Sequence, residues 1–267
     1  MKIGIIGFGN MGSAIAERAK KEFSLIAFDK VKEINSQGVE IAKSLLDLLD
    51  KSEAIILAVK PQDISSLLEE IKGNLKNQLI ISIAAGITTK CIEERLGSAR
   101  VVRVMPNIAA QIGEGVSGLY KGKFANEQDL DLTWRLLSYV GMTEAFDDES
   151  MLDAVTAVSG SGPAYFCYYI KDRGNAVSKK DEFIRQLTQS AISIGFDKIF
   201  AAGISEKTVK GTISLLVEKN WSCEELIKKV ASKGGTTEAA LDVLSKGGSL
   251  EEAVKAALKR AKELSMN

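Results

Sequence analysis

The sequence predicts an α/β fold with a mostly parallel sheet in its N-terminal domain, followed by an all-helical C-terminal domain. Over the first half of the 267 residues, short apolar runs rich in β-branched residues alternate with longer amphipathic runs. This alternation is typical of βαβ units. Beyond residue 147 the strand patterns give way to helical periodicity. We therefore expect one domain at 1–147 and a second at 148–267.

The elements of the first domain follow from their own patterns. The run at 54–59 is continuously apolar, as expected of a strand buried on both faces of a parallel sheet. Other apolar, β-branched runs predict further strands at 2–6, 24–28, 79–83, 101–104, 118–120 and 142–146. Helical periodicity between the strands predicts helices at 11–21, 43–49, 64–75, 90–96 and 127–139.

The second domain shows a succession of helical patterns. They predict helices at 150–158, 163–170, 181–200, 205–219, 223–231, 237–244 and 250–264. In the last of these, Leu250, Val254 and Leu258 fall on one face. A helical domain too thin to enclose a core alone often completes itself against a second copy. We expect a homodimer, or a larger assembly built from dimers.

Composition limits the classes of partner and of chemistry. Lysines plus arginines number 35, as do aspartates plus glutamates, so the formal net charge of zero favours neither nucleic acid nor an anionic membrane. The sequence has no histidine, and its three cysteines share no CxxC spacing, so we expect no metal site and no disulfide framework. A proton donor or acceptor must then be a carboxyl, amine, phenol, thiol, hydroxyl or water.

The apolar runs also bear on location. The N-terminal apolar run is too short for a signal peptide, and no run approaches the roughly 20 apolar residues that a membrane helix needs. We expect a soluble, cytoplasmic protein.

A glycine-rich loop points to the first ligand. The segment after the first strand matches the pattern G-x-G-x-x-G and reads Gly7-Phe8-Gly9-Asn10-Met11-Gly12. A helix follows it, and Asp29 stands at the end of the next strand. This context is typical of a Rossmann dinucleotide-binding domain, in which the helix N-terminus faces the pyrophosphate. We expect NADPH or NADH.

The choice between the two cofactors stays open. The Asp29 carboxylate would accept hydrogen bonds from the 2′-hydroxyl of the NADH ribose and repel the 2′-phosphate of NADPH. Lys30 and Lys32 lie beside it and offer positive charge to that phosphate.

Further segments at element boundaries extend the pattern along the chain. They are Ala58-Val59-Lys60-Pro61-Gln62, Ser82-Ile83-Ala84-Ala85-Gly86, Arg103-Val104-Met105-Pro106-Asn107, Gly113-Glu114-Gly115, Ser159-Gly160-Ser161-Gly162-Pro163-Ala164-Tyr165 and Ser232-Lys233-Gly234-Gly235-Thr236-Thr237. With these segments the chain resembles the pyrroline-5-carboxylate reductase family over nearly its whole length. The resemblance implies reduction of a cyclic imine, 1-pyrroline-5-carboxylate, to L-proline by NADPH or NADH, the last step of proline biosynthesis.

The resemblance also implies site residues. It implies that the glycine loop, Asp29 and Lys30 bind the cofactor. Further cofactor-binding residues implied by the resemblance are Ala58, Val59, Lys60, Pro61, Ala84, Ala85, Gly86 and Asn107. It makes Thr237 the catalytic hydroxyl that contacts the ring nitrogen. Ser232, Gly234, Gly235, Thr236 and Thr237 would form the substrate segment. In that segment the N–H groups of the last three residues would hold the carboxylate at a helix N-terminus.

The chemistry suits a chain without histidine. Reduction of a carbonyl generates an alkoxide, which requires a strong, well-placed acid. Reduction of a protonated imine generates a neutral amine, so no proton need arrive during hydride transfer. Positioning and a hydroxyl contact then suffice.

The chain departs from the family pattern at several places. Ile108-Ala109 stand where the family has T-P, and Lys233 replaces the proline of S-P-G-G-T-T. Asn220 occupies a position where some members carry a carboxylate. A polar stretch at 171–180 interrupts the long helix of the family. It would be a helix break with a surface loop, a repositioned dimer interface or a disordered insert.

Alternative functions follow from these departures. One is a relative of the β-hydroxyacid dehydrogenases, although Phe166 stands where that class has its catalytic lysine. Another is a reductase of a different imine, and a third is a non-catalytic NAD(P)-binding homologue.

Overall fold

The computed structural model describes residues 1–171 and 176–266, with the side chains of 176–178 left aside. The chain forms two compact units. The first comprises Met1–Met105 and Ser117–Glu149, and the second comprises Pro106–Val116 and Ser150–Asn267. The segment at 106–116, which precedes the boundary expected near residue 147, therefore clusters with the second unit. Part of the polar stretch at 171–180, namely 172–175, lies outside the described residues.

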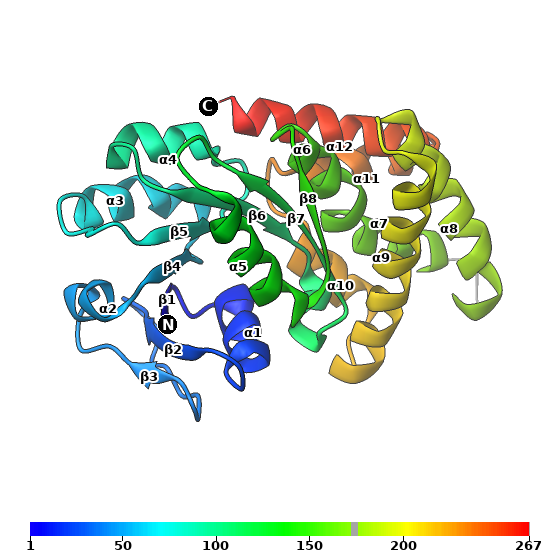
Figure 1. Ribbon diagram of the computed structural model, residues 1–267. Coiled ribbons are helices and arrows are strands. Elements are labelled where there is room, and N and C mark those ends of the chain that lie inside the picture. Colours follow the sequence, from blue (N-terminus) through cyan, green and yellow to red (C-terminus); the bar gives the residue numbers. More distant parts are fainter. Residues whose placement is uncertain (172–175, 267) are drawn as a thin grey trace. The chain divides into compact units, whose positions relative to one another are not determined.

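The sheet determines where ligand-binding loops can gather. Among the described residues, eight strands form one sheet in the order β3-β2-β1-β4-β5-β6-β7-β8 (Figure 1). Their bounds are β1 Lys2–Ile6, β2 Ser24–Phe28, β3 Glu40–Ile41, β4 Ala54–Leu57, β5 Leu79–Ser82, β6 Val101–Pro106, β7 Gly115–Lys121 and β8 Gly141–Phe146. All pairs from β3 to β6 are parallel. This order and direction are those of a Rossmann sheet, so the predicted fold class is confirmed.

Several helices of the first unit begin at side chains that cap their N-termini. They are α1 Asn10–Ala19, α2 Leu45–Lys51, α3 Pro61–Ile71, α4 Thr89–Leu96 and α5 Glu127–Ser138. The Ser44 hydroxyl accepts the Asp47 N–H at the start of α2, and Asn126 and Asp129 form a reciprocal capping box at the start of α5. Proline is the first residue of α3, a position that needs no N–H donor.

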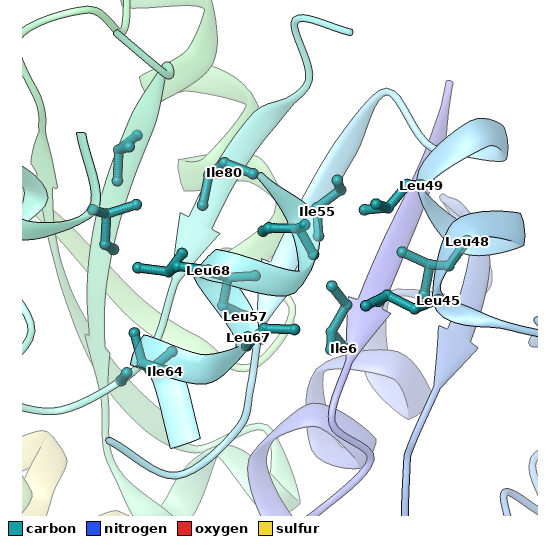
Figure 2. Close-up of a cluster of buried hydrophobic side chains, with 14 of the residues drawn as sticks. Ile6, Leu45, Leu48, Leu49, Ile55, Leu57, Ile64, Leu67, Leu68 and Ile80 are labelled. Atoms are coloured by element: carbon teal, nitrogen blue, oxygen red, sulfur yellow. The ribbon is translucent and has the colours of Figure 1, made fainter. Parts of the chain in front are cut away.

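A buried aliphatic cluster joins the central strands to two helices. Figure 2 shows Ile6, Ile55, Leu57 and Ile80 from β1, β4 and β5 facing leucines and an isoleucine of α2 and α3. These strand residues are at most 3% exposed. Burial of each such side chain contributes about 1.5–3 kcal/mol. The cluster therefore fixes the strands whose carboxyl ends carry the glycine loop and its neighbours.

The second unit is built from helices, as predicted. They are the 3₁₀ turn η1 Ile108–Ile112, α6 Met151–Val155, the π-helical turn η2 Thr156–Gly160, α7 Gly162–Lys171, α8 Ala176–Ser193, α9 Lys198–Lys219, α10 Cys223–Val230, α11 Thr236–Ser245 and α12 Leu250–Ser265. Across both described ranges, no helix combines the length and apolar character needed to cross a membrane.

The single helix predicted at 181–200 is wrong. The structure ends α8 at Ser193 and begins α9 at Lys198. Gly195 adopts a φ of +112°, which a helix cannot include. The Asp197 carboxylate then accepts the N–H groups of Ile199 and Phe200, at 2.9 and 3.0 Å, and so starts the new helix.

Two smaller differences concern strands. The prediction missed β3, which has only two residues and therefore no recognisable alternation. The strand expected at 118–120 extends over Gly115–Lys121.

Candidate active site

The glycine loop connects β1 to α1 and is shaped by close backbone contacts. Gly7 has a φ of +95°, and a side chain there would meet the Ala58 carbonyl oxygen at 2.7 Å. A side chain at Gly12 would overlap the Gly7 carbonyl oxygen. An added Cβ at Gly9, in contrast, meets no atom within 4 Å. Gly7 and Gly12 are therefore required by close packing of the backbone. Gly9 leaves open space for a ligand that approaches the backbone, which fits a pyrophosphate.

Two further predicted cofactor segments of the first unit follow strands at the same edge of the sheet as this loop. Ala58–Pro61 follow β4 directly and Ala84–Gly86 follow β5 within two residues. Because β1, β4 and β5 are parallel neighbours, their carboxyl ends lie at one edge of the sheet. Asn10 and Met11 open α1, whose first N–H groups have no partner within the helix and attract anions.

Asp29 lies at the same edge, after β2, and is bound to backbone groups. Its Oδ2 accepts the Phe8 N–H at 2.6 Å, and its Oδ1 accepts the N–H groups of Val31 and Lys32 at 2.9 and 2.8 Å. Burial raises the pKa of Asp29, but these three hydrogen bonds outweigh it and hold the pKa below its ordinary value. The carboxylate stays charged at neutral pH and ties the glycine loop to the end of β2.

The two lysines beside Asp29 point to different partners. Lys30 is largely exposed, and its Nζ lies 3.2 Å from a Glu70 carboxylate oxygen on α3. Lys32 reaches back to the glycine loop, where its Nζ donates to the Phe8 carbonyl oxygen at 3.2 Å. Of the two lysines, Lys32 places its positive charge at the glycine loop. The sequence had predicted Lys30 as the cofactor-binding residue.

Asn107 belongs to the second unit and has structural partners. Its N–H donates to the Val116 carbonyl oxygen at 3.0 Å, and its side-chain oxygen accepts the Val116 N–H at 3.0 Å. Its side-chain amide donates to the Ser159 carbonyl oxygen at 3.2 Å. The residue is 2% exposed. Asn107 thus ties the segment around η1 to the π-helical turn, and its predicted contact with the cofactor stays a prediction.

The predicted substrate segment forms the start of α11. Gly234 has a φ of +69°, and its N–H donates to a Glu238 carboxylate oxygen at 2.6 Å. A side chain at Gly235 would overlap the Ser232 hydroxyl. The positive φ of Gly234 favours glycine, and a side chain at Gly235 would require the Ser232 hydroxyl to move. Lys233 is exposed, as expected of a lysine that points to water.

The free N–H groups of this turn are fewer than the resemblance implied. The Gly235 N–H already donates to the Ser232 carbonyl oxygen at 2.9 Å. Thr236 and Thr237 are the first two residues of α11, where N–H groups have no partner within the helix. Those two N–H groups and the helix dipole are what this turn offers to a carboxylate.

Three hydroxyl groups converge beside these N–H groups. The Ser161 Oγ lies 3.0 Å from the Thr236 Oγ1 and 3.0 Å from the Thr237 Oγ1. Ser161 is fully buried and Thr237 is 3% exposed. Ser161 follows the π-helical turn η2, and its N–H donates to the Thr156 carbonyl oxygen five residues back at 2.9 Å. Ser161 lies within the Ser159–Tyr165 motif, but no local sequence pattern predicts a π-helical turn, so the contact of Ser161 with the start of α11 could not be predicted.

Comparisons with known proteins agree on one family. Residues 149–264 match a family model described as pyrroline-5-carboxylate reductase dimerisation, and residues 2–86 match one described as NADP oxidoreductase coenzyme F420-dependent. The chain is 34% identical to the pyrroline-5-carboxylate reductase of Methanosarcina acetivorans, covering 98% of this chain and 97% of that protein. It is 32% identical to the Arabidopsis thaliana reductase, covering 100% and 96%.

A solved structure gives the same result. The pyrroline-5-carboxylate reductase of Coxiella burnetii matches with a TM-score of 0.66 and 30% identity, covering 98% of each chain. The matched residues cover nearly the whole of both chains. The chain belongs to the pyrroline-5-carboxylate reductase family.

Proposed function

We propose that this chain reduces 1-pyrroline-5-carboxylate to L-proline with NADPH or NADH, and that the start of α11 binds the imine. The main support for this site is that the buried Thr237 hydroxyl lies beside the first N–H groups of α11. The two groups match the two polar parts of the substrate, its ring nitrogen and its carboxylate. We expect the ring nitrogen at the Thr237 Oγ1 and the carboxylate at the N–H groups of Thr236 and Thr237.

The cofactor is assigned to the carboxyl edge of the first unit. Gly7–Gly12 and the N-terminus of α1 would hold the pyrophosphate, with Ala58–Pro61 and Ala84–Gly86 beside them. The bound nicotinamide would supply the hydride. The pyrroline carboxylate reductase of Plasmodium falciparum, 27% identical with a TM-score of 0.64, has been solved with NADP bound. Which of the two cofactors this chain prefers depends on Asp29 and Lys32.

The protein's own groups suit this reaction without a strong acid. Hydride addition to the carbon of a protonated imine turns the C=N π electrons into the nitrogen lone pair, so the product is a neutral amine. No side chain has to deliver a proton in that step. The requirement is a hydrogen-bond partner for the ring nitrogen and an anchor for the carboxylate, and α11 offers both.

We also propose that the chain acts as a homodimer or as an assembly of dimers, and that it acts in the cytoplasm. The match of 149–264 to a dimerisation model supports the first proposal. Ile199 and Val217 of α9 are 86% and 77% exposed in the single chain, which is unusual for large aliphatic residues. Light scattering should give an even multiple of the chain mass, and a strictly monomeric active enzyme would exclude the proposed assembly.

Removal of the Thr237 hydroxyl gives the most direct test of the proposed site. Thr237→Ala should lower kcat with the imine by roughly 10- to 100-fold, because a hydrogen bond to a charged group contributes about 1.5–3 kcal/mol. Thr133→Ala provides the matched control: it removes an equally buried hydroxyl whose partner is the Asp129 carbonyl oxygen on its own helix. Its kcat should equal that of the wild type. An unchanged kcat in Thr237→Ala would remove this hydroxyl from the mechanism.

A further inference from the structure

Of the two hydrogen bonds between Ser161 and the threonines of α11, the one to Thr237 has a defined direction. The Thr237 hydroxyl donates its hydrogen to the Ser161 Oγ, at 3.0 Å. A hydroxyl carries one hydrogen and two lone pairs. With the hydrogen directed at Ser161, the Thr237 oxygen can only accept a hydrogen bond from a substrate.

Ser161 can act as an acceptor for Thr237 because its own hydrogen has another partner. Its Oγ lies 3.0 Å from the Thr236 Oγ1, and either of these two hydroxyls can donate to the other. Donation from Thr237 to Ser161 and from Ser161 to Thr236 gives the Thr237 and Ser161 hydrogens an acceptor each, and two consecutive hydrogen bonds strengthen each other.

The position of Ser161 is itself held by backbone hydrogen bonds. Its N–H donates to the Thr156 carbonyl oxygen at 2.9 Å, and its carbonyl oxygen accepts the N–H groups of Ala164 and Tyr165 at 3.0 and 3.3 Å. The residue has no solvent exposure. These backbone bonds with η2 and α7 hold the Ser161 backbone, and its side chain contacts the start of α11 at the predicted substrate segment.

We propose that Ser161 is a positioning residue that turns the lone pairs of the Thr237 hydroxyl toward the imine nitrogen, so that the site selects the protonated imine. The nitrogen of the protonated form carries a hydrogen to donate, whereas the neutral imine offers only a lone pair. The protonated form is also the one that accepts hydride readily. Binding and reactivity thus select the same form of the substrate. This inference rests on the proposed function and adds a residue to its mechanism.

A double-mutant cycle tests whether Ser161 acts through Thr237. The steady-state rates of imine-dependent cofactor oxidation would be compared for the wild type, Ser161→Ala, Thr237→Val and the double variant. Ser161→Ala should lower kcat about 3- to 10-fold in the wild type, the scale of one hydrogen bond between neutral groups. In the Thr237→Val background the same change should alter kcat by less than about 2-fold, because the hydroxyl that Ser161 directs is gone.

Two results would overturn the proposal. An equal loss of kcat from Ser161→Ala in both backgrounds would show a role in packing alone, and no loss in the wild-type background would show no role. A wild type that oxidises no cofactor with this imine would instead contradict the proposed function, so the two failures are separable.

A control and a reserve variant protect the test against simple misfolding. Ser205→Ala removes another fully buried serine hydroxyl of the second unit, one with no hydrogen-bond partner among the described residues, and should leave kcat unchanged. Thermal unfolding and cofactor binding would show that each variant is folded. If Ser161→Ala does not fold, the cycle is run with Ser161→Cys, because a thiol has similar size but accepts hydrogen bonds weakly. The same non-additivity is expected there.

Discussion

At the scale of single residues, the Asp29 carboxylate combines a structural role with an electrostatic one. It accepts three backbone N–H groups, from Phe8, Val31 and Lys32, and so joins the glycine loop to the end of β2. These bonds keep its pKa low and its charge in place at neutral pH. A charge fixed in this way also lies where Rossmann domains meet the ribose that distinguishes NADH from NADPH.

Asp29→Asn should therefore move cofactor preference toward NADPH. The amide keeps one oxygen to accept a backbone N–H but removes the charge that repels a 2′-phosphate. We expect the ratio of kcat/KM for NADPH to that for NADH to rise about tenfold, equal to roughly 1.4 kcal/mol, a plausible size for one charge contact near a protein surface. Asp131→Asn, an exposed change on α5, should leave the ratio as it is. A ratio that stays constant in Asp29→Asn would show that Asp29 serves the loop alone.

Residue types in the candidate site could be predicted from the sequence, but their partners could not. The strand pattern at 24–28 places Asp29 after β2, and the helical pattern that begins at residue 237 places Thr237 at a helix start. Both positions follow from local patterns. That Asp29 holds the Phe8 N–H depends on the pairing of β1 with β2, which joins residues 21 apart in the chain. That Ser161 directs Thr237 depends on contact between residues 76 apart. Such pairings arise from packing, which no local window contains.

At the scale of elements, two glycines of the loop between β1 and α1 are required for different physical reasons. Gly12 is required because α1 passes so close to the loop that any side chain would overlap the Gly7 carbonyl oxygen. Gly9 has open space around it, and its φ of −74° suits any residue. The protein fold thus constrains Gly12, while the expected ligand constrains Gly9.

The variants Gly9→Ala and Gly12→Ala should consequently behave differently. Gly9→Ala should unfold at the temperature of the wild type but bind NADPH or NADH at least about tenfold more weakly, because its methyl group enters the space assigned to the pyrophosphate. Gly12→Ala should lower the unfolding temperature as well, since backbone must move to admit the methyl group. Titration of the cofactor's fluorescence and thermal unfolding measure the two effects. Tight cofactor binding by Gly9→Ala would contradict the assigned phosphate site.

Elements were predictable where one pattern extends over many residues. The buried run of β4 and the amphipathic α12 were identified because apolar spacing and helix or strand geometry agree over their whole lengths. The prediction failed at 181–200, where apolar residues continue through the break between α8 and α9. There Gly195 and the capping Asp197 decide the structure, and two residues outweigh the periodicity around them.

At the scale of the whole molecule, the two units divide the requirements of the reaction. In the proposed site, the parallel sheet of the first unit would supply the edge that binds the cofactor, and the helices of the second would supply a buried hydroxyl and free N–H groups for the imine. The chain has no histidine, and imine reduction needs no strong acid in the hydride step. Chemistry and composition therefore agree on an imine as the substrate class.

The proposed reduction is tested most directly by measuring cofactor oxidation and proline formation together, with the purified full chain. Racemic 1-pyrroline-5-carboxylate would be added to protein with NADPH, and separately with NADH, while cofactor absorbance and proline are both followed. We expect imine-dependent oxidation with at least one cofactor and one proline formed for each cofactor oxidised. Folded protein that binds cofactor but oxidises none of it with this imine would rule out the proposed reduction and indicate a different imine or a non-catalytic role.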